Sequence, residues 1–80
     1  MKLIPVVSSM VSTVGYDLET GRLVVQFPGD GQSVFWEYLG VPHSIVLTFL
    51  FSESLGKSFA QLVKKGRFEN RRITAQQAHA

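Results

Sequence analysis

The 80-residue sequence contains no cysteine, which excludes disulfide bonds, thiolate nucleophiles and every cysteine-based zinc site. It also lacks a long hydrophobic run. The longest, IVLTFLF at residues 45–51, is far shorter than the ~20 residues that a helix needs to cross a bilayer. The apolar N-terminal stretch is interrupted by Pro5 and does not form the core of a signal peptide. We therefore expect a cytoplasmic protein with no membrane partner.

A chain this short has room for one hydrophobic core, and its hydrophobic fraction of 45% with 18% charged residues is typical of a globular domain. Beyond Gly66 the sequence becomes polar, and ITAQQAHA has little apolar content with which to order itself. These features predict a single domain over residues 1–68 and a basic, flexible, disordered C-terminal tail over residues 69–80.

The first half carries strand patterns. VVSSMVSTVGYD is rich in β-branched residues and leads into DLETGR, where Asp17 can start a turn and Gly21 can supply a positive φ. RLVVQF alternates, with Leu23, Val25 and Phe27 on one face. SVFWEY alternates in the same way and places Val34, Trp36 and Tyr38 on that face. PGDGQ between them is turn sequence. The pattern predicts a three-stranded antiparallel β-meander.

The period changes to helical after Pro42, which suits the first turn of a helix. Two α-helices packed on one face of the sheet are predicted, giving an α+β fold. The second begins at the N-cap residue Ser54 and ends at Gly66. In the first helix, an additional apolar arc predicts either deep burial or a homodimer contact. The arc consists of Ile45, Leu47 and Phe51.

Charge is distributed unevenly. Residues 57–80 carry a net charge of +5, whereas residues 1–56 carry −3. Such an asymmetry indicates either a solvated helix end or a surface for an acidic partner. The candidate binding residues are Lys57, Lys64, Lys65, Arg67, Arg71 and Arg72. At 100° per residue, Lys57, Gln61 and Lys64 share one strip of the second helix. Phe68 and Phe35 are candidates for stacking on bases.

The GKS sequence at residues 56–58 is not the end of a phosphate-binding loop, because Phe51 stands where the first glycine of that motif must lie. A weaker possibility is an anion site at the helix N-terminus, formed by Ser54 and Gly56. The alternative is that Ser54 caps the helix and Gly56 permits close packing.

Catalytic patterns are absent. His43 and His79 are the only histidines, no base and acid are placed beside a serine, and the carboxylates show no metal-ligand spacing. We expect no enzymatic activity, no metal and no cofactor.

The order of the segments SSMVSTVGYD, LVVQF, WEYLGVP and SESLGKSF resembles the KTSC domain family. This small domain occurs alone in bacterial and phage proteins and at the C-terminus of some lysyl-tRNA synthetases. The resemblance covers GYD at residues 15–17, Tyr38 followed by GVP at residues 40–42, and Ser54, Gly56 and Phe59. Trp36 replaces a usual tyrosine, and Glu37 stands where a basic residue is common. The resemblance implies an α+β fold and suggests RNA or an RNA-handling protein as partner.

Two functions are therefore expected as alternatives. The first is a non-enzymatic binding module that contacts RNA, DNA or a nucleic-acid-handling complex through its basic C-terminal helix. The second is a phage-type protein inhibitor of a host nucleic-acid machine, such as RNA polymerase or a CRISPR effector. The second would act by protein–protein contact rather than by binding nucleic acid directly.

Overall fold

The computed structural model of the protein describes residues 3–8, 10–28 and 34–79. It shows an α+β fold built on an antiparallel five-stranded sheet with the strand order β1-β2-β3-β4-β5. The strands are β1 (Ile4–Pro5), β2 (Thr13–Asp17), β3 (Arg22–Phe27), β4 (Val34–Leu39) and β5 (Glu69–Ile73). The helices are α1 (His43–Leu50), α2 (Leu55–Ser58), the π-helical segment η1 (Phe59–Lys64) and α3 (Ala75–Ala78). The predicted meander is present as β2, β3 and β4. The prediction of three strands and two helices missed β1, β5 and α3.

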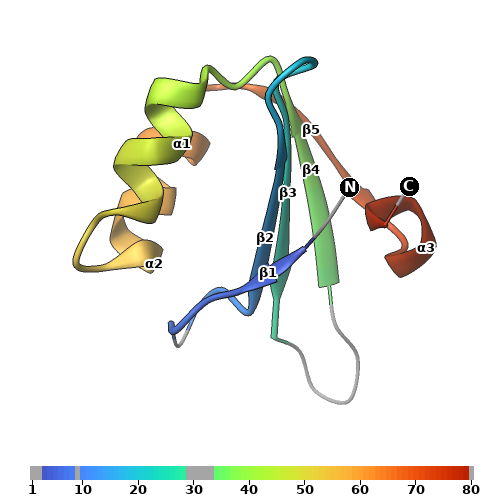
Figure 1. Cartoon of the computed structure of the whole chain (residues 1–80), viewed down its shortest axis with the longest axis horizontal. Coiled ribbons are helices and arrows are strands. Elements are labelled where there is room, and N and C mark those ends of the chain that lie inside the picture. The colour runs from blue at the N-terminus through green and yellow to red at the C-terminus, as the bar shows by residue number, and fades with distance from the viewer. Residues whose placement is uncertain (1–2, 9, 29–33, 80) are drawn as a thin grey trace.

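The sheet has a helical layer on each face. Figure 1 shows α1 and α2 on one side of the strands and α3 on the other. Strand alternation assigns the side chains to two faces, and each face carries a buried apolar cluster. Leu23, Val25 and Tyr38 belong to the core beneath α1 and η1, whereas Val24 and Phe35 belong to a second cluster on the α3 face. A strand that is covered on both sides needs apolar residues at successive positions, as in LVV of β3.

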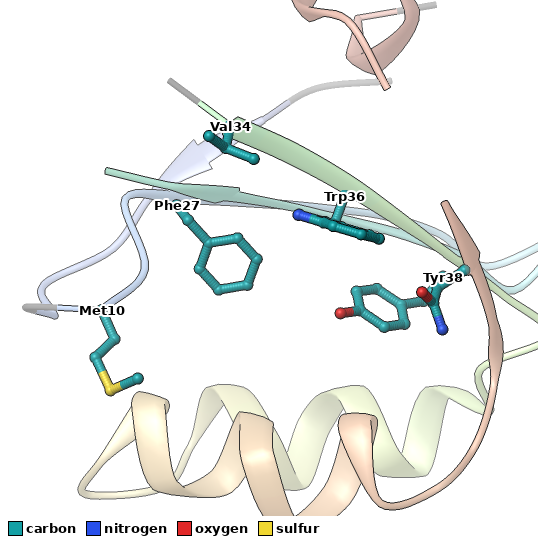
Figure 2. A pocket seen from close by; sticks show the side chains of 6 residues that line it. Met10, Phe27, Val34, Trp36 and Tyr38 are labelled. Carbon is teal, nitrogen blue, oxygen red and sulfur yellow. The ribbon is translucent and has the colours of Figure 1, made fainter. Parts of the chain in front are cut away.

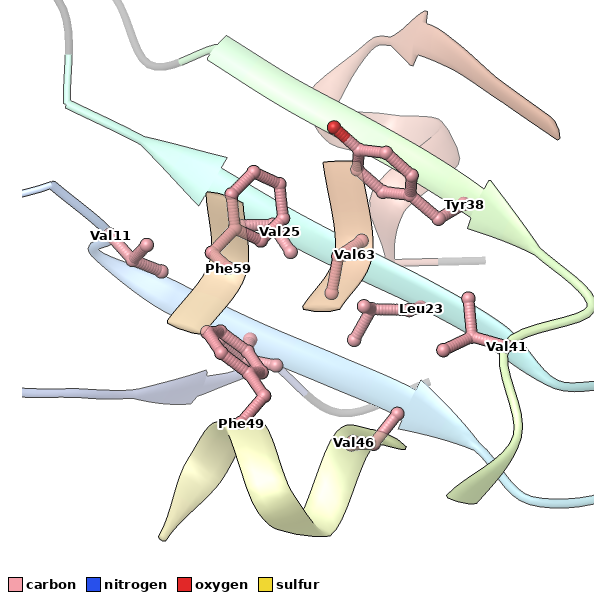
Figure 3. Packing of buried hydrophobic residues seen from close by; sticks show 10 residues of the cluster. Val11, Leu23, Val25, Tyr38, Val41, Val46, Phe49, Phe59 and Val63 are labelled. Atoms are coloured by element: carbon pink, nitrogen blue, oxygen red, sulfur yellow. The ribbon is translucent and has the colours of Figure 1, made fainter. Parts of the chain in front are cut away.

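The first core is held together by side chains from both layers (Figure 3). Val46 and Phe49 of α1 and Val63 of η1 are buried against the sheet, as the helical spacing predicts. Phe59 of η1 is the central aromatic residue, with ring centroids 5.2 Å from Phe27 and 5.5 Å from Tyr38 in edge-on geometry. Such aromatic pairs fix the position of η1 over the sheet.

A hydrogen-bonded corner connects the hairpin to the helical layer. Gly21, with φ of 73°, closes the β2–β3 turn by donating its N–H to the Asp17 carbonyl at 2.8 Å. The Val41 N–H donates to the Gly21 carbonyl at 3.0 Å, and the Tyr16 hydroxyl donates to the Val41 carbonyl. The expected roles of Asp17 and Gly21 are confirmed. The other expected turn, PGDGQ, lies largely outside the described residues.

The prediction of a disordered tail from residue 69 is wrong. Residues 69–73 form β5, which pairs with β4 through backbone hydrogen bonds that do not require apolar side chains. One apolar residue, Ile73, is buried opposite Phe35 and helps to anchor the strand. Thr74 and Gln77 then form a capping box that begins α3. This threonine and glutamine three residues apart were the signal in the sequence that could have predicted the helix.

The second predicted helix is also different in detail. Ser54 caps it by accepting the Lys57 N–H at 3.5 Å, as expected. From Phe59, however, the winding widens to π-helical, and the Lys65 N–H donates to the Ala60 carbonyl five residues earlier. The prediction that Lys57, Gln61 and Lys64 share one strip was based on α-helical geometry, which does not hold through η1.

We expect Gly40→Ala to destabilise the fold through backbone strain alone. Gly40 has φ of 68°, and a Cβ at this position would meet no atom within 4 Å. The left-handed conformation of an alanine costs about 1–2 kcal/mol, which urea denaturation should detect as a lower midpoint with an unchanged slope. Gly40→Asn is the control and should cost less, because asparagine tolerates this conformation better. Equal midpoints for Gly40→Ala and the wild type would contradict the assignment.

Candidate functional site

Several basic side chains of the C-terminal third are exposed and unpaired within the described part of the chain. Lys65 and Arg67 lie in the turn that follows η1, and Arg72 lies on β5, the outermost strand of the sheet. None of the three guanidinium or ammonium groups has a hydrogen bond or ion pair to another described residue. We call these three residues the basic edge. Lys57 is also exposed but lies on α2, before η1, and the side chain of Lys64 is outside the described residues.

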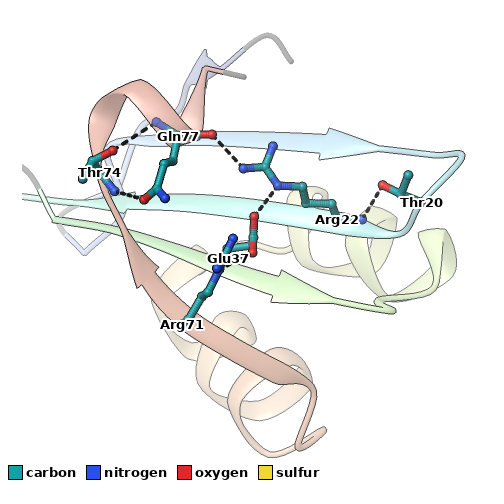
Figure 4. Close-up of polar contacts among 6 residues, drawn as sticks. All are labelled: Thr20, Arg22, Glu37, Arg71, Thr74 and Gln77. Carbon is teal, nitrogen blue, oxygen red and sulfur yellow. Dashed lines mark hydrogen bonds and ion pairs between the residues drawn. The ribbon is translucent and has the colours of Figure 1, made fainter.

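Arg71 is different from its neighbour Arg72, because its charge is already paired. It lies opposite Glu37 in the β4–β5 register, and its Nε donates to Glu37 Oε1 at 2.8 Å. Arg22 on β3 donates its Nε to the other carboxylate oxygen. A second nitrogen of Arg22 donates to the Gln77 carbonyl of α3 at 2.8 Å (Figure 4). This network therefore connects β3, β4, β5 and α3 on one face.

The pKa of Glu37 follows from the balance of two opposing effects. Burial by itself raises the pKa, since the side chain is almost fully removed from water. Hydrogen bonds and charge from Arg22 and Arg71 lower it and are together stronger, so the pKa lies below its ordinary value of 4.5. Glu37 is therefore ionised at neutral pH and bound by two cations.

The register of β5 places its side chains on alternate faces. Asn70 lies opposite Tyr38 and Arg72 lies opposite Trp36. Directly opposite residues in an antiparallel pair have their side chains on the same face. Arg72 and Asn70 therefore lie on the face covered by α1 and η1, while Arg71 lies on the α3 face with Glu37.

A pocket of about 510 Å³ opens on this same face. Its lining residues are Met10, Phe27, Val34, Trp36, Tyr38 and Asn70. Figure 2 shows the rings of Phe27, Trp36 and Tyr38 around one space between the sheet and the helices. The lining is mainly apolar, with the Trp36 indole N–H and the Tyr38 hydroxyl among its few polar groups. Burial raises the pKa of Tyr38 above 10.0, so its hydroxyl stays protonated.

The sequence-predicted stacking residues do not form this pocket. Phe35 cannot act as a platform, because it is only 6% exposed and packs with Val24, Ile73 and Ala78 on the α3 face. Phe68 is half-buried against the first core, and its ring occupies the space that a side chain at Gly66 would need. The pocket instead uses Phe27, Trp36 and Tyr38, which sequence alternation placed on one face but which we assigned to the core.

The predicted anion site is better explained by packing. The Ser54 hydroxyl already accepts the Lys57 N–H of the short α2. Gly56 is buried, and a Cβ there would lie 2.5 Å from the sulfur of Met10. The alternative interpretation from the sequence, a capped helix with close packing at the glycine, describes this geometry.

The apolar arc of α1 is divided by the fold. Ile45 is half-buried against the first core, whereas Leu47 and Phe51 are exposed, Phe51 by 84%. Leu50 is also exposed and, with Leu47 and Phe51, follows the i, i+3, i+4 spacing of one helix face. We call Leu47, Leu50 and Phe51 the α1 patch.

No three histidine or carboxylate side chains among the described residues are close enough to hold a metal ion. None of the described helices has the length and hydropathy needed to cross a membrane.

The meander and its covering helices define a small α+β domain, and the sequence identifies which one. Residues 7–68 match the KTSC domain, so the chain belongs to the KTSC domain family. An uncharacterised protein of Stutzerimonas stutzeri is 33% identical over 73 residues, covering 91% of this chain and 99% of that protein. The crystal structure of a KTSC domain protein from Yersinia pestis has a TM-score of 0.80 and 34% identity. That match covers 91% of this chain and 97% of the other.

We expect Glu37→Gln to lower the free energy of unfolding by about 1–3 kcal/mol at neutral pH, because two cations lose their charged acceptor. The folded-state pKa of Glu37 is depressed below 4.5, so this stabilisation is present above 4.5 and is lost as the pH falls through the folded-state value. Urea denaturation across the acid range should therefore show the wild-type and Glu37→Gln curves converging at low pH.

Arg71→Gln is the comparison variant. Its side chain is 65% exposed, and it should cost less than Glu37→Gln because exposed ion pairs contribute only about 0–1 kcal/mol. A Glu37→Gln penalty that stays constant down to the lowest pH would show that the network does not depend on the ionised carboxylate.

Proposed function

We propose that this protein is a non-enzymatic module that binds nucleic acid, and that the basic edge is its binding surface. The observation that supports this proposal is the unpaired state of Lys65, Arg67 and Arg72 within the described structure. Cations that have no internal partner are available to neutralise phosphates, and phosphate contacts supply most of the sequence-independent affinity for nucleic acid.

The position of these cations also supports the proposal. Lys65 and Arg67 lie in the turn at residues 65–67, and Arg72 lies on β5, the outermost strand of the sheet that the described residues form. Basic residues that are spread along a turn and a strand suit an extended polyanion better than a compact acidic ligand. The competing explanation is that charged side chains on an edge strand prevent edge-to-edge aggregation, and it predicts no affinity for nucleic acid.

The single carboxylate buried among the described residues, Glu37, is engaged by Arg22 and Arg71. Since both carboxylate oxygens already accept hydrogen bonds, Glu37 is poorly placed to act as a general base. The nucleic-acid contact we propose differs from the sequence-based expectation in one respect, because it uses a turn and a strand in place of a helix.

A second candidate function is supported by the α1 patch. Three exposed apolar side chains on one helix end favour contact with a protein surface. This contact would suit an inhibitor that binds a nucleic-acid-handling protein such as RNA polymerase or a CRISPR effector, or a homodimer. In this reading the basic edge would meet acidic groups of the partner protein.

The salt dependence of binding tests the first function. We expect the protein to bind a short fluorescent single-stranded RNA at low salt, with an affinity that falls steeply as salt increases. Lys65→Gln should reduce the slope of log K against log salt by about 0.7, the value of one lost phosphate contact on a single strand. Leu18→Glu changes the net charge by the same amount at an exposed hairpin turn and should leave the slope unchanged. No binding at low salt would exclude this function.

Phe51→Ser tests the second function. If the α1 patch binds protein, the wild type should retain a partner from a nuclease-treated host lysate, and Phe51→Ser should lose it while Lys65→Gln retains it. Solution scattering of the purified protein would show twice the monomer mass for a homodimer and the monomer mass for Phe51→Ser. Retention that disappears on nuclease treatment would instead favour the nucleic-acid function.

A further inference from the structure

We propose that the pocket between the sheet and the helical layer binds one unpaired nucleobase, with Arg72 holding the adjoining phosphate. This inference rests on the proposed function and specifies it further. It makes the protein a reader of single strands, because a base inside a duplex is stacked and cannot enter a pocket without being extruded.

The aromatic lining provides a surface on which a base can stack. Trp36 is half-buried, and its ring has no aromatic partner in the described part of the structure. Phe27 and Tyr38, in contrast, both contact Phe59 edge-on and are fixed by the core. The pocket therefore combines one available indole face with two rigid rings. Its volume of about 510 Å³ is within the range of about 300–1,000 Å³ that is usual for small-ligand sites.

The polar groups of the pocket match the edge of a heteroaromatic ring better than they match a purely apolar ligand. The Trp36 indole nitrogen is a donor, and the Tyr38 hydroxyl can donate or accept. Figure 2 shows both directed into the space between the sheet and the helices, and neither has a hydrogen-bond partner among the described residues. The Asn70 amide nitrogen donates to the Phe68 carbonyl at 2.9 Å, which leaves its amide oxygen as an acceptor.

Arg72 supplies the charge that a nucleotide needs and a neutral aromatic ligand does not. It lies directly opposite Trp36 on the neighbouring strand, so the two side chains extend from the same face. A guanidinium group binds phosphate through two parallel hydrogen bonds. The adjacent Arg71 cannot replace it, because Arg71 lies on the other face and is paired with Glu37.

The experiment uses Trp36 as its own reporter, since it is the single tryptophan in the chain. The full-length protein is titrated with a single-stranded RNA hexanucleotide, with an abasic oligomer carrying the same phosphates, and with an RNA duplex. We expect the hexanucleotide to quench Trp36 fluorescence and the abasic oligomer to bind about tenfold more weakly, since base stacking on an aromatic ring has roughly that effect on affinity. The duplex should bind without quenching.

A matched pair of variants tests the phosphate contact. Arg72→Gln and Arg71→Gln remove the same charge from neighbouring positions of one strand. We expect Arg72→Gln to weaken hexanucleotide binding severalfold more than Arg71→Gln. Tyr38→Phe removes only the hydroxyl, and it should lower the affinity for the hexanucleotide more than the affinity for the abasic oligomer. Circular dichroism should confirm that each variant is folded.

The outcomes separate this inference from the proposed function. Equal affinities for the hexanucleotide and the abasic oligomer, with no change in Trp36 fluorescence, would overturn the base pocket and leave nucleic-acid binding intact. Equal effects of Arg71→Gln and Arg72→Gln would overturn the role of Arg72. No binding of any oligomer at low salt would overturn both proposals.

Discussion

The pairing of the buried Glu37 carboxylate with two arginines is the interaction on which the arrangement of the C-terminal part depends. Its oxygens accept hydrogen bonds from Arg22 of β3 and Arg71 of β5, and Arg22 also donates to the Gln77 carbonyl of α3. A carboxylate in this position is costly to bury unless it is paired, so the strand that brings Arg71 is held against β4. The network thereby sets the position of a segment whose own sequence is almost entirely polar.

The Arg71–Glu37 pair also determines which side chains of β5 lie on the opposite face of the sheet. Because Arg71 faces Glu37, strand alternation turns Arg72 and Asn70 to the side of the pocket. The two faces of β5 therefore differ, because one carries the ion pair with Glu37 and the other carries the Arg72 cation beside Trp36. The apolar pocket remains beside that cation at the edge of the sheet.

Much of the fold could be predicted from local patterns. Alternation in RLVVQF and SVFWEY predicts the strands and their faces, Gly21 predicts the hairpin turn, and Ser54 predicts a helix start. Each of these signals depends on residues that are close in sequence. β5 could not be predicted in this way, because its stability comes from pairing with β4, from the Arg71–Glu37 ion pair and from one buried residue, Ile73. The candidate site was predicted only in part, since charge could be counted but not assigned to a face.

The sequence by itself determined the α+β class, the meander and the excess of positive charge after residue 56, because composition and periodicity are local properties. Its short motifs resemble the KTSC family, and the match over residues 7–68 confirms the family. Only the tertiary structure decided which of those charges are paired. Arg71 and Arg72 are chemically identical and adjacent, yet one neutralises Glu37 and the other has no partner among the described residues. The tertiary structure likewise decided that Phe35 is buried beneath α3 while Trp36 lines a pocket. The reason is that pairing and burial depend on the register between strands, and residues that are distant in sequence set that register.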